Sequence, residues 1–141
     1  MLYEAVIQFT GIDKKGNDKT YRERYIVDEC DFFASAETKM YEEFSKRYCT
    51  DLDVTDIKRS KVKEIINEKP KEGIDYKIFF ATIVDKFYDA DTDETKEVKY
   101  TVALFALDIK DAYKNIEQYM KQGFEDMELK EIKETKILDI L

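Results

Sequence analysis

Hydrophobic and polar residues alternate along several stretches of the chain, with the period of two that is typical of half-buried β-strands. In residues 2–10, Ala5, Ile7 and Phe9 fall on one side of the expected strand, and Glu4 and Gln8 fall on the other. Residues 76–84 are more continuously apolar, which predicts a central strand. The pattern predicts six strands, at residues 2–10, 21–28, 51–66, 76–84, 97–106 and 126–141.

Two stretches follow a helical period instead. We expect Ser35 to cap a helix whose inward side chains recur every four residues, and Asp108 to cap a second helix that ends at Gly123. The predicted inward residues are Ala36, Met40, Phe44 and Tyr48 in the first helix, and Ile109, Ala112, Ile116, Tyr119 and Met120 in the second.

The connections carry turn signals. Gly16 and Asn17 tolerate positive φ and predict a hairpin turn at residues 13–18, and residues 85–95 predict a longer, acidic hairpin loop. Residues 67–73 contain the only proline and predict a connector. Within residues 51–66 the strand alternation slips, which predicts a bulge or bend near residues 55–60.

Residues 51–66 are repeated at residues 126–141. Five of the sixteen positions are identical at an offset of 75, and that offset also aligns Arg24, Tyr25 and Val27 with Lys99, Tyr100 and Val102. A repeat of this kind indicates a tandem duplication. The identical pairs are Asp51/Asp126, Ile57/Ile132, Lys58/Lys133, Lys61/Lys136 and Ile65/Ile140.

The predicted fold class is therefore α+β, a tandem duplication of a ββαβ unit with a mainly antiparallel sheet, two helices on one face and a pseudo-two-fold axis. Each half is short for an independent core, so we expect one domain over residues 1–141 with a shared core and a six-stranded sheet. The repeats are assigned to residues 2–66 and 76–141, with residues 67–75 as the linker.

Composition disfavours several classes of function. The chain has 141 residues, 43% hydrophobic and 40% charged, with a net charge of −8, which disfavours a protein that coats duplex DNA. No histidine is present, and Cys30 and Cys49 have no metal-ligand spacing, so we interpret both as reduced structural thiols and predict no metal and no cofactor. The first residues read as a strand and no apolar run reaches membrane length, which predicts a cytoplasmic protein without a membrane partner.

Catalytic signatures are also missing from the sequence. Phosphate-loop, dinucleotide-binding and nucleophile-elbow motifs are absent, and imidazole chemistry is excluded by the lack of histidine. Asp89, Asp91 and Asp93 match the opening of a calcium loop, but Glu94 and Tyr100 occupy the positions that need glycine and glutamate, which favours a solvated acidic hairpin. These features predict a non-enzymatic protein.

At residues 25–28, the helix after them and residues 54–59 (VTDIKR), the chain resembles an uncharacterised family of small proteins from gut bacteria and their phages, known as a domain of unknown function. The resemblance covers mainly the first half and brings no catalytic residues. It implies a phage or prophage setting.

The candidate site is a set of basic residues on the repeated segment: Lys58, Arg59, Lys61, Lys133 and Lys136. The four lysines recur in both copies, and converging lysines attract an anion such as a phosphate or a nucleic-acid backbone. The alternative interpretation, which we favour, is that they protect a strand edge from aggregation. Most of the ten tyrosines and nine phenylalanines sit at alternating strand positions, which favours core packing over base stacking.

Three functions stay open. The sequence favours a non-enzymatic, phage-associated binding protein that docks to a host or phage macromolecule or sequesters a small anionic ligand, with a protein or small anion preferred to nucleic acid. The first alternative is a single-stranded nucleic-acid-binding protein, and the second is a carboxylate-metal enzyme, which needs at least three converging acidic residues. A homo-oligomer is compatible with each.

Overall fold

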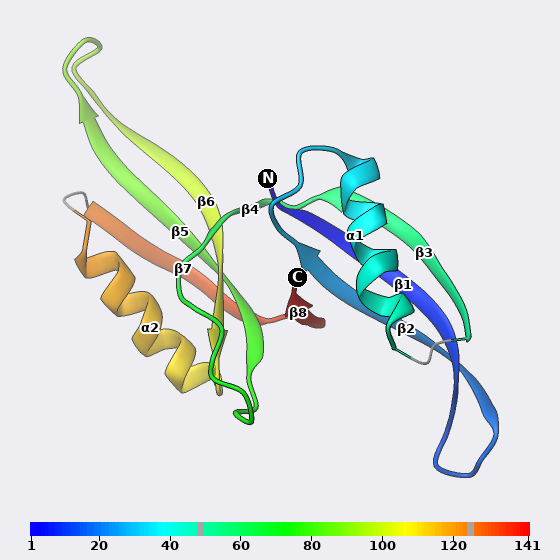
Figure 1. Cartoon of the computed structure of the whole chain (residues 1–141). Helices are drawn as coiled ribbons and strands as arrows, with labels where there is room; N and C mark the ends of the chain where they lie inside the picture. The colour runs from blue at the N-terminus through cyan, green and yellow to red at the C-terminus, as the bar shows by residue number, and fades with distance from the viewer. Residues whose placement is uncertain (48–49, 124–125) are drawn as a thin grey trace. The chain divides into compact units, whose positions relative to one another are not determined.

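The computed structural model describes residues 1–47, 50–123 and 126–141, and the fold is α+β (Figure 1). Tyr48 was predicted to lie on the inward stripe of the first helix, and Cys49 was predicted to be a reduced thiol. Both residues fall outside the described residues. Cys30 is a free, buried thiol, as predicted. The elements in chain order are β1 (Tyr3–Ile12), β2 (Asp18–Val27), α1 (Phe33–Ser45), β3 (Thr50–Arg59), β4 (Val62–Ile65), β5 (Lys77–Asp89), β6 (Glu94–Ala106), α2 (Ile109–Lys121), β7 (Asp126–Glu134) and β8 (Ile137–Ile140).

In the described part of the chain, the eight strands form two four-stranded sheets, ordered β3-β1-β2-β8 and β4-β6-β5-β7. We expected a single six-stranded sheet, and two of its strands are each divided in the structure. The segment 51–66 is broken between Arg59 and Val62 into β3 and β4, and 126–141 is broken in the same way into β7 and β8. The polar run around each break has no apolar side chain to bury, which allows the chain to leave one sheet there.

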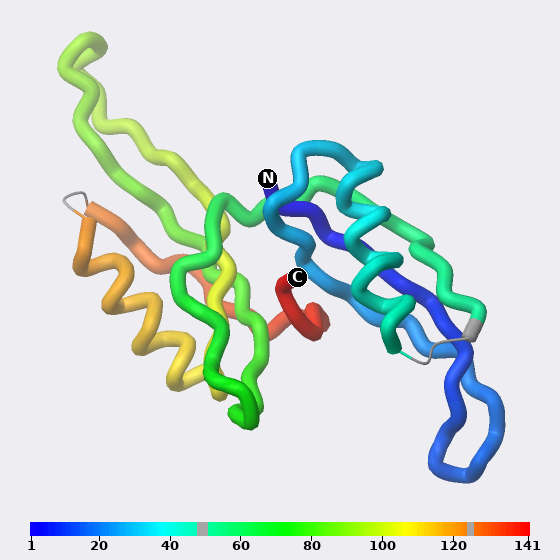
Figure 2. The backbone as a smooth tube through the Cα atoms, in the orientation of Figure 1, coloured from blue at the N-terminus to red at the C-terminus, as the bar shows by residue number. Residues whose placement is uncertain are grey.

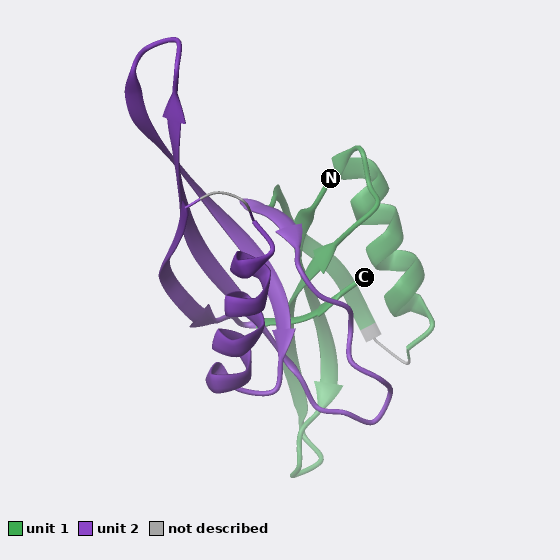
Figure 3. Cartoon of the chain, turned by 90° about the vertical axis from the view of Figure 1, so that its left-hand side faces the viewer, with its two compact units in different colours: residues 1–60, 137–141 green, residues 61–136 purple. Residues whose placement is uncertain are grey.

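The two parts of each broken segment join different sheets. β3 pairs antiparallel with β1, whereas β4 pairs parallel with β6; β7 pairs antiparallel with β5, whereas β8 pairs parallel with β2. The chain consequently divides into unit 1, Met1–Ser60 with Ile137–Leu141, and unit 2, Lys61–Lys136 (Figure 3). Each sequence repeat therefore supplies its last strand to the sheet built by the other repeat.

Each unit has its own apolar cluster between its helix and one face of its sheet. In unit 1 the cluster includes Tyr3 and Ile7 of β1 with Met40 and Phe44 of α1. In unit 2 it includes Phe79, Ile83 and Leu104 of the sheet with Ala112 and Ile116 of α2. The expectation of one shared core is thus replaced by two clusters among the described residues. That residues 1–141 act as one domain stays a prediction.

The helix starts differ from one another. Asp108 caps α2 as predicted, because its carboxylate accepts a hydrogen bond from the Asp111 amide. The Ser35 cap was wrong: α1 begins at Phe33, with Phe32 in the cap position and no side-chain cap. The ring of Phe33 packs edge-on against Tyr3 at 5.1 Å, which holds this earlier turn against β1.

The two hairpins are also unequal. The turn at 13–18 is confirmed, with Asp13 accepting hydrogen bonds from the Lys15 and Asn17 amides and Gly16 at positive φ. The second loop is shorter than the predicted 85–95, because the strands stay paired out to Asp89 and Glu94. The pairing of β5 with β7 ends at Lys86 and Asp126, so the tip of the β5–β6 hairpin extends beyond β7 (Figures 1 and 2).

Strand pairing shows that the repeats do not share one offset. Ala5 faces Ile57 and Tyr25 in unit 1, and Ala81 faces Ile132 and Val102 in unit 2. Ile57 and Ile132 keep the offset of 75, but Ala5 corresponds to Ala81 at 76, and Tyr25 to Val102 at 77. The predicted match of Tyr25 with Tyr100 was therefore wrong, because the connections between strands differ in length.

Candidate functional site

Lys58 and Lys133 lie on edge strands. Lys58 is on β3 and faces Glu4 of β1, and Lys133 is on β7 and faces Phe80 of β5. Both lysines are exposed, and β3 and β7 each end the strand order of their sheet. An exposed lysine on an edge strand discourages pairing with another chain, because a partner strand would have to bury its charge.

A bulge accompanies each of these lysines. The register of β3 skips Thr55, between Val54 and Asp56, and the register of β7 skips Lys130, between Leu129 and Glu131. Thr55 and Lys130 are equivalent at the offset of 75, and the first bulge lies where the slip in alternation predicted it. A bulge twists an edge strand away from flat pairing, so it works in the same direction as the lysine.

The neighbours of the two lysines differ in chemistry. Directly opposed residues on paired strands share a face of the sheet, so Lys58 and Glu4 lie on the face away from α1. Glu4 is 8% exposed and is the buried charged residue of the described chain. In unit 2 the equivalent position is Phe80, and the Lys61 ammonium lies 6.0 Å from its ring centroid. Lys61 and Lys133 therefore both neighbour one buried aromatic ring.

Lys61 and Lys136 occupy the two crossover points. The boundary between the units falls between Ser60 and Lys61 and again after Lys136. The strands before them end alike, since the Ser60 amide donates to the Leu2 carbonyl at 2.9 Å and the Thr135 amide donates to the Ile78 carbonyl at 3.0 Å. The repetition of these lysines thus coincides with the repetition of a crossover, a structural constraint that the sequence did not reveal.

The five predicted residues are divided between the two units. Lys58 and Arg59 belong to unit 1, whereas Lys61, Lys133 and Lys136 belong to unit 2. Arg59 pairs opposite Tyr3, and its equivalent, Glu134, pairs opposite Phe79. All five side chains are exposed. The predicted pair of equivalent lysine clusters stays a prediction. The surroundings of the equivalent Lys58 and Lys133 differ, because one faces Glu4 and the other faces Phe80.

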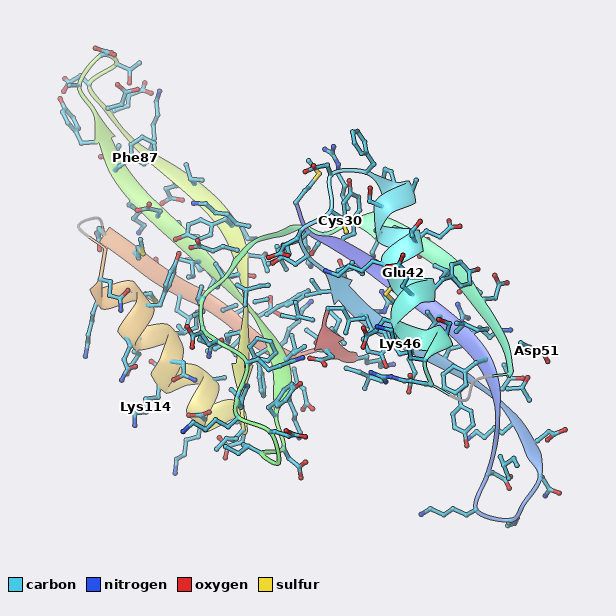
Figure 4. The ribbon with its side chains drawn as sticks, in the orientation of Figure 1. Cys30, Glu42, Lys46, Asp51, Phe87 and Lys114 are labelled. Carbon is cyan, nitrogen blue, oxygen red and sulfur yellow. The ribbon has the colours of Figure 1, made fainter. Side chains whose placement is uncertain are left out.

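Each unit also has an open groove beside its helix. The groove in unit 1 has a volume of about 640 Å³ and the groove in unit 2 about 510 Å³. Figure 4 labels Cys30 beside the start of α1 and Glu42 further along the helix. The first groove is lined by Glu29, Cys30, Ala34, Ser35, Thr38, Lys39 and Glu42, and the second by Tyr113, Glu117, Met120, Lys121, Asp126, Met127, Glu128 and Leu129.

Large apolar side chains are exposed where both helices begin. Phe32 is 70% exposed and Phe33 is half-exposed at the start of α1. Leu107, 53% exposed, and Ile109, 55% exposed, flank the start of α2. Ile109 was predicted to face inward, which was wrong. We name these two places the apolar corners. The signal was present in the sequence, because adjacent phenylalanines ahead of a helix cannot both join a stripe with a spacing of four.

A polar network fixes β4 in unit 2. The Tyr119 hydroxyl donates to the Glu64 carboxylate, and the Lys63 ammonium lies 4.3 Å from the ring centroid of Tyr100. Burial, and then the hydrogen bond to Glu64, raise the pKa of Tyr119 well above 10.0. In unit 1, burial and the hydrogen bond to Glu23 raise the pKa of Tyr25 in the same direction.

Two further kinds of structure are absent from the described residues. No group of three or more His, Cys, Asp or Glu side chains is arranged there to hold a metal ion, which is the geometry that a carboxylate-metal enzyme requires. No described helix is long and apolar enough to cross a membrane.

Comparison with curated proteins and with solved structures finds no match to the chain. One protein family, described as "Domain of unknown function (DUF4494)", matches residues 1–141. The match spans both repeats, beyond the first-half segments that suggested an uncharacterised family. The chain belongs to the DUF4494 family of domains of unknown function.

Proposed function

We propose that this protein is a non-enzymatic interaction module that docks to another protein through its apolar corners. The observation that carries the proposal is the exposure of Phe32 and Phe33 in unit 1 and of Leu107 and Ile109 in unit 2. Exposed apolar side chains that are grouped mark interaction surfaces more often than scattered ones do. Their presence at the start of both helices gives the chain two similar docking points.

The surroundings of the first corner support a protein partner that carries basic groups. Residues 28–37 contain Asp28, Glu29, Asp31 and Glu37 and no lysine or arginine. Aromatic rings beside carboxylates suit lysine or arginine side chains, which pack their stems on the rings and direct their charge to the acids. The phage or prophage setting is part of the proposal and is supported by the sequence resemblance alone.

The single-stranded nucleic-acid alternative has weaker support. Stacking needs aromatic rings exposed on a sheet face. On the face of the second sheet away from α2, Phe80 and Phe105 are both buried. These two rings offer no platform for bases, and the neighbouring lysines would act on the phosphates alone.

A capture experiment tests the proposal. The wild-type chain, a Phe32→Ser/Phe33→Ser variant and a Leu107→Ser/Ile109→Ser variant are used as bait in lysate from lysogenic or infected cells, with circular dichroism to check folding. A Leu138→Ser variant is the matched control, because Leu138 is half-exposed, as Phe33 is, but lies on β8. We expect one specific protein to be lost with both corner variants and kept with the control.

A charge-reversal variant separates this proposal from the anion hypothesis. Lys58→Glu/Lys61→Glu should leave capture of the protein unchanged if the corners bind it. Circular dichroism checks the folding of this variant, because a glutamate at position 58 would lie opposite the buried Glu4. Capture that survives both corner variants and disappears with the lysine variant would contradict the proposal. Salt-dependent binding of an oligonucleotide would then favour the nucleic-acid alternative.

A further inference from the structure

The fourth strand of each sheet occupies the same kind of position. We name the side of β2 that pairs with β8, and the side of β6 that pairs with β4, the acceptor edges. On β2 the partners are Arg24 with Ile137, Tyr25 with Asp139 and Ile26 with Ile140. On β6 the partners are Thr101 with Val62, Val102 with Glu64 and Ala103 with Ile65. Each register skips the second residue of the incoming strand, so the two acceptor edges receive their strands in one geometry.

The backbone hydrogen bonds at the end of the strand repeat as well. The Leu141 amide donates to the Ile26 carbonyl at 2.8 Å, and the Ile66 amide donates to the Ala103 carbonyl at 3.0 Å. Beyond this point the edges differ. The Asp28 amide donates to the Leu141 carbonyl, whereas the Phe105 amide donates to the side chain of Asn67. In both edges the backbone amide that follows the pairing is satisfied.

The two incoming segments follow one sequence pattern. Residues 62–66 read VKEII and residues 137–141 read ILDIL, with an apolar residue at positions one, four and five and an acidic residue at position three. Val62 and Ile137 are both buried, whereas Lys63 and Leu138 are both exposed. Position two therefore accepts either a charged or an apolar residue, and both edges are paired with a segment of the same pattern.

The segments reach these edges through short polar crossovers. The preceding strands end at Arg59 and Glu134, and β4 and β8 begin three residues later. Lys61 and Lys136, next to the incoming strands, are exposed. Exchange of an identical element between copies is a low-cost route to a dimer when a short hinge joins the element to its parent unit, because the exchanged strand makes the same contacts in either copy.

From these observations we propose that the acceptor edge of β2 is a binding site for a β-strand of the pattern shared by residues 62–66 and 137–141, and that a second copy of this chain is its partner. The β8 segment of one copy pairs with β2 of the other, in parallel and in the register seen within one chain. Two such exchanges make a closed dimer. This interaction uses the edge of the first sheet and is independent of the apolar corners.

Protein concentration decides whether β8 pairs with β2 of its own chain or with β2 of a second copy. A segment tethered by a short flexible link competes at an effective concentration on the order of millimolar. Exchange between copies should therefore stay minor at micromolar concentrations and become substantial near millimolar. Once formed, the dimer should persist on dilution, because both strands must leave their edges before the copies separate.

The test refolds the full-length chain. Unlabelled and ¹⁵N-labelled protein are mixed in denaturant, refolded at concentrations from about 1 µM to a few millimolar, and measured by native mass spectrometry after dilution. We expect dimers of mixed mass that rise with the refolding concentration. Ile137→Asp should abolish them, because Ile137 is 4% exposed, and Leu138→Asp should keep them, because Leu138 is 50% exposed.

A peptide measurement covers the case in which Ile137→Asp fails to fold. Fluorescent peptides of residues 60–66 and 135–141 are refolded together with the wild-type chain. Both should be captured in a one-to-one complex and lower the dimer yield, whereas a 135–141 peptide with aspartate in place of Ile137 should not. A wild-type chain that stays monomeric at every concentration and captures neither peptide would overturn the proposal. Dimers of equal yield from a folded Ile137→Asp variant would overturn it as well.

Discussion

Unit 1 and unit 2 have the same strand pairings, but they close their last strand by different means. In unit 2 the strand β4 is continuous with the connector that follows it, and Asn67, Glu64 and Lys63 tie it to β6 and α2 through side chains. In unit 1 the strand β8 arrives from the far end of the chain, and its end is held by backbone hydrogen bonds to Ile26 and Asp28. The two acceptor edges therefore share their backbone pairing, whereas the contacts around that pairing differ.

The helices differ more than the sheets. Phe44 is fully buried in unit 1, and its equivalent in α2, Met120, is partly exposed at the edge of the second cluster. The first helix lacks a side-chain cap, and the second has one at Asp108. At its helix, unit 1 thus depends on packing, whereas unit 2 also has a side-chain cap. Four measurements test the differences between the units.

The largest effect is expected at Phe44. Phe44→Ala removes a fully buried ring and leaves a cavity, which should lower the free energy of unfolding by about 3–5 kcal/mol. Met120→Ala should cost less than about 2 kcal/mol, because Met120 is partly solvated already. Urea denaturation of both variants measures the difference, and equal losses would show that the two helices are anchored alike.

The next effect concerns the fourth strand. Ile137→Ala should destabilise the protein by about 2 kcal/mol, the lower end of the range for buried isoleucine, because β8 is short and at an edge. Leu138→Ala should change stability by no more than about 0.5 kcal/mol, since its side chain is exposed. Chemical denaturation checks both variants, and a larger loss of stability at Leu138 would show that the opposite face of β8 is the buried one.

A smaller effect separates the two helix starts. Asp108→Ala removes the acceptor for the Asp111 amide and should cost about 1 kcal/mol. Phe32→Ala removes no capping bond and should cost under about 0.5 kcal/mol. Phe32→Asp should instead add stability by supplying the missing cap. Thermal unfolding of the three variants tests the contrast, which fails if Phe32→Asp is neutral and Asp108→Ala is harmless.

The smallest effect is on pH dependence. The folded chain raises the pKa of Tyr25 and Tyr119 above 10.0, the ordinary value for tyrosine. The stability from these protonated hydroxyls is complete below pH 10 and is lost as the pH rises above it, because the unfolded chain releases those protons first. Absorbance at 295 nm should show that these two tyrosines ionise at a higher pH than the others. Glu64→Gln should bring the pKa of Tyr119 nearer 10.0 and leave the pKa of Tyr25 unchanged.

The sequence supports the elements better than it supports their assembly. The alternation at Ala5, Ile7 and Phe9 and the cap at Asp108 are local signals, and the structure places a strand and a capped helix there. The crossover at Ser60 is different, because whether a strand continues or changes sheets depends on pairing partners far away in the chain. Neither periodicity nor the offset of 75 contains that information.

The candidate residues show the same limit. Repetition singled out Lys58, Lys61, Lys133 and Lys136, and the structure places them at two bulged edges and two crossovers. Repetition alone does not distinguish a shared ligand from a shared backbone constraint. The adjacent Phe32 and Phe33 were a signal for the first apolar corner, but Leu107 matches no motif. Exposure depends on the side chains that surround a residue, so the second corner could not be predicted.

Each repeat supplies its last strand to the sheet of the other repeat, and backbone NMR measures this pairing directly. This pairing predicts interstrand nuclear Overhauser effects between Ile140 and Ile26 and between Ile65 and Ala103. It also predicts slow hydrogen exchange of the Leu141 amide. The experiment uses the chain at micromolar concentration, where exchange between copies is minor. Nuclear Overhauser effects that join residues 137–140 to β6 and residues 62–65 to β2 would contradict this pairing, since each repeat would then complete its own sheet.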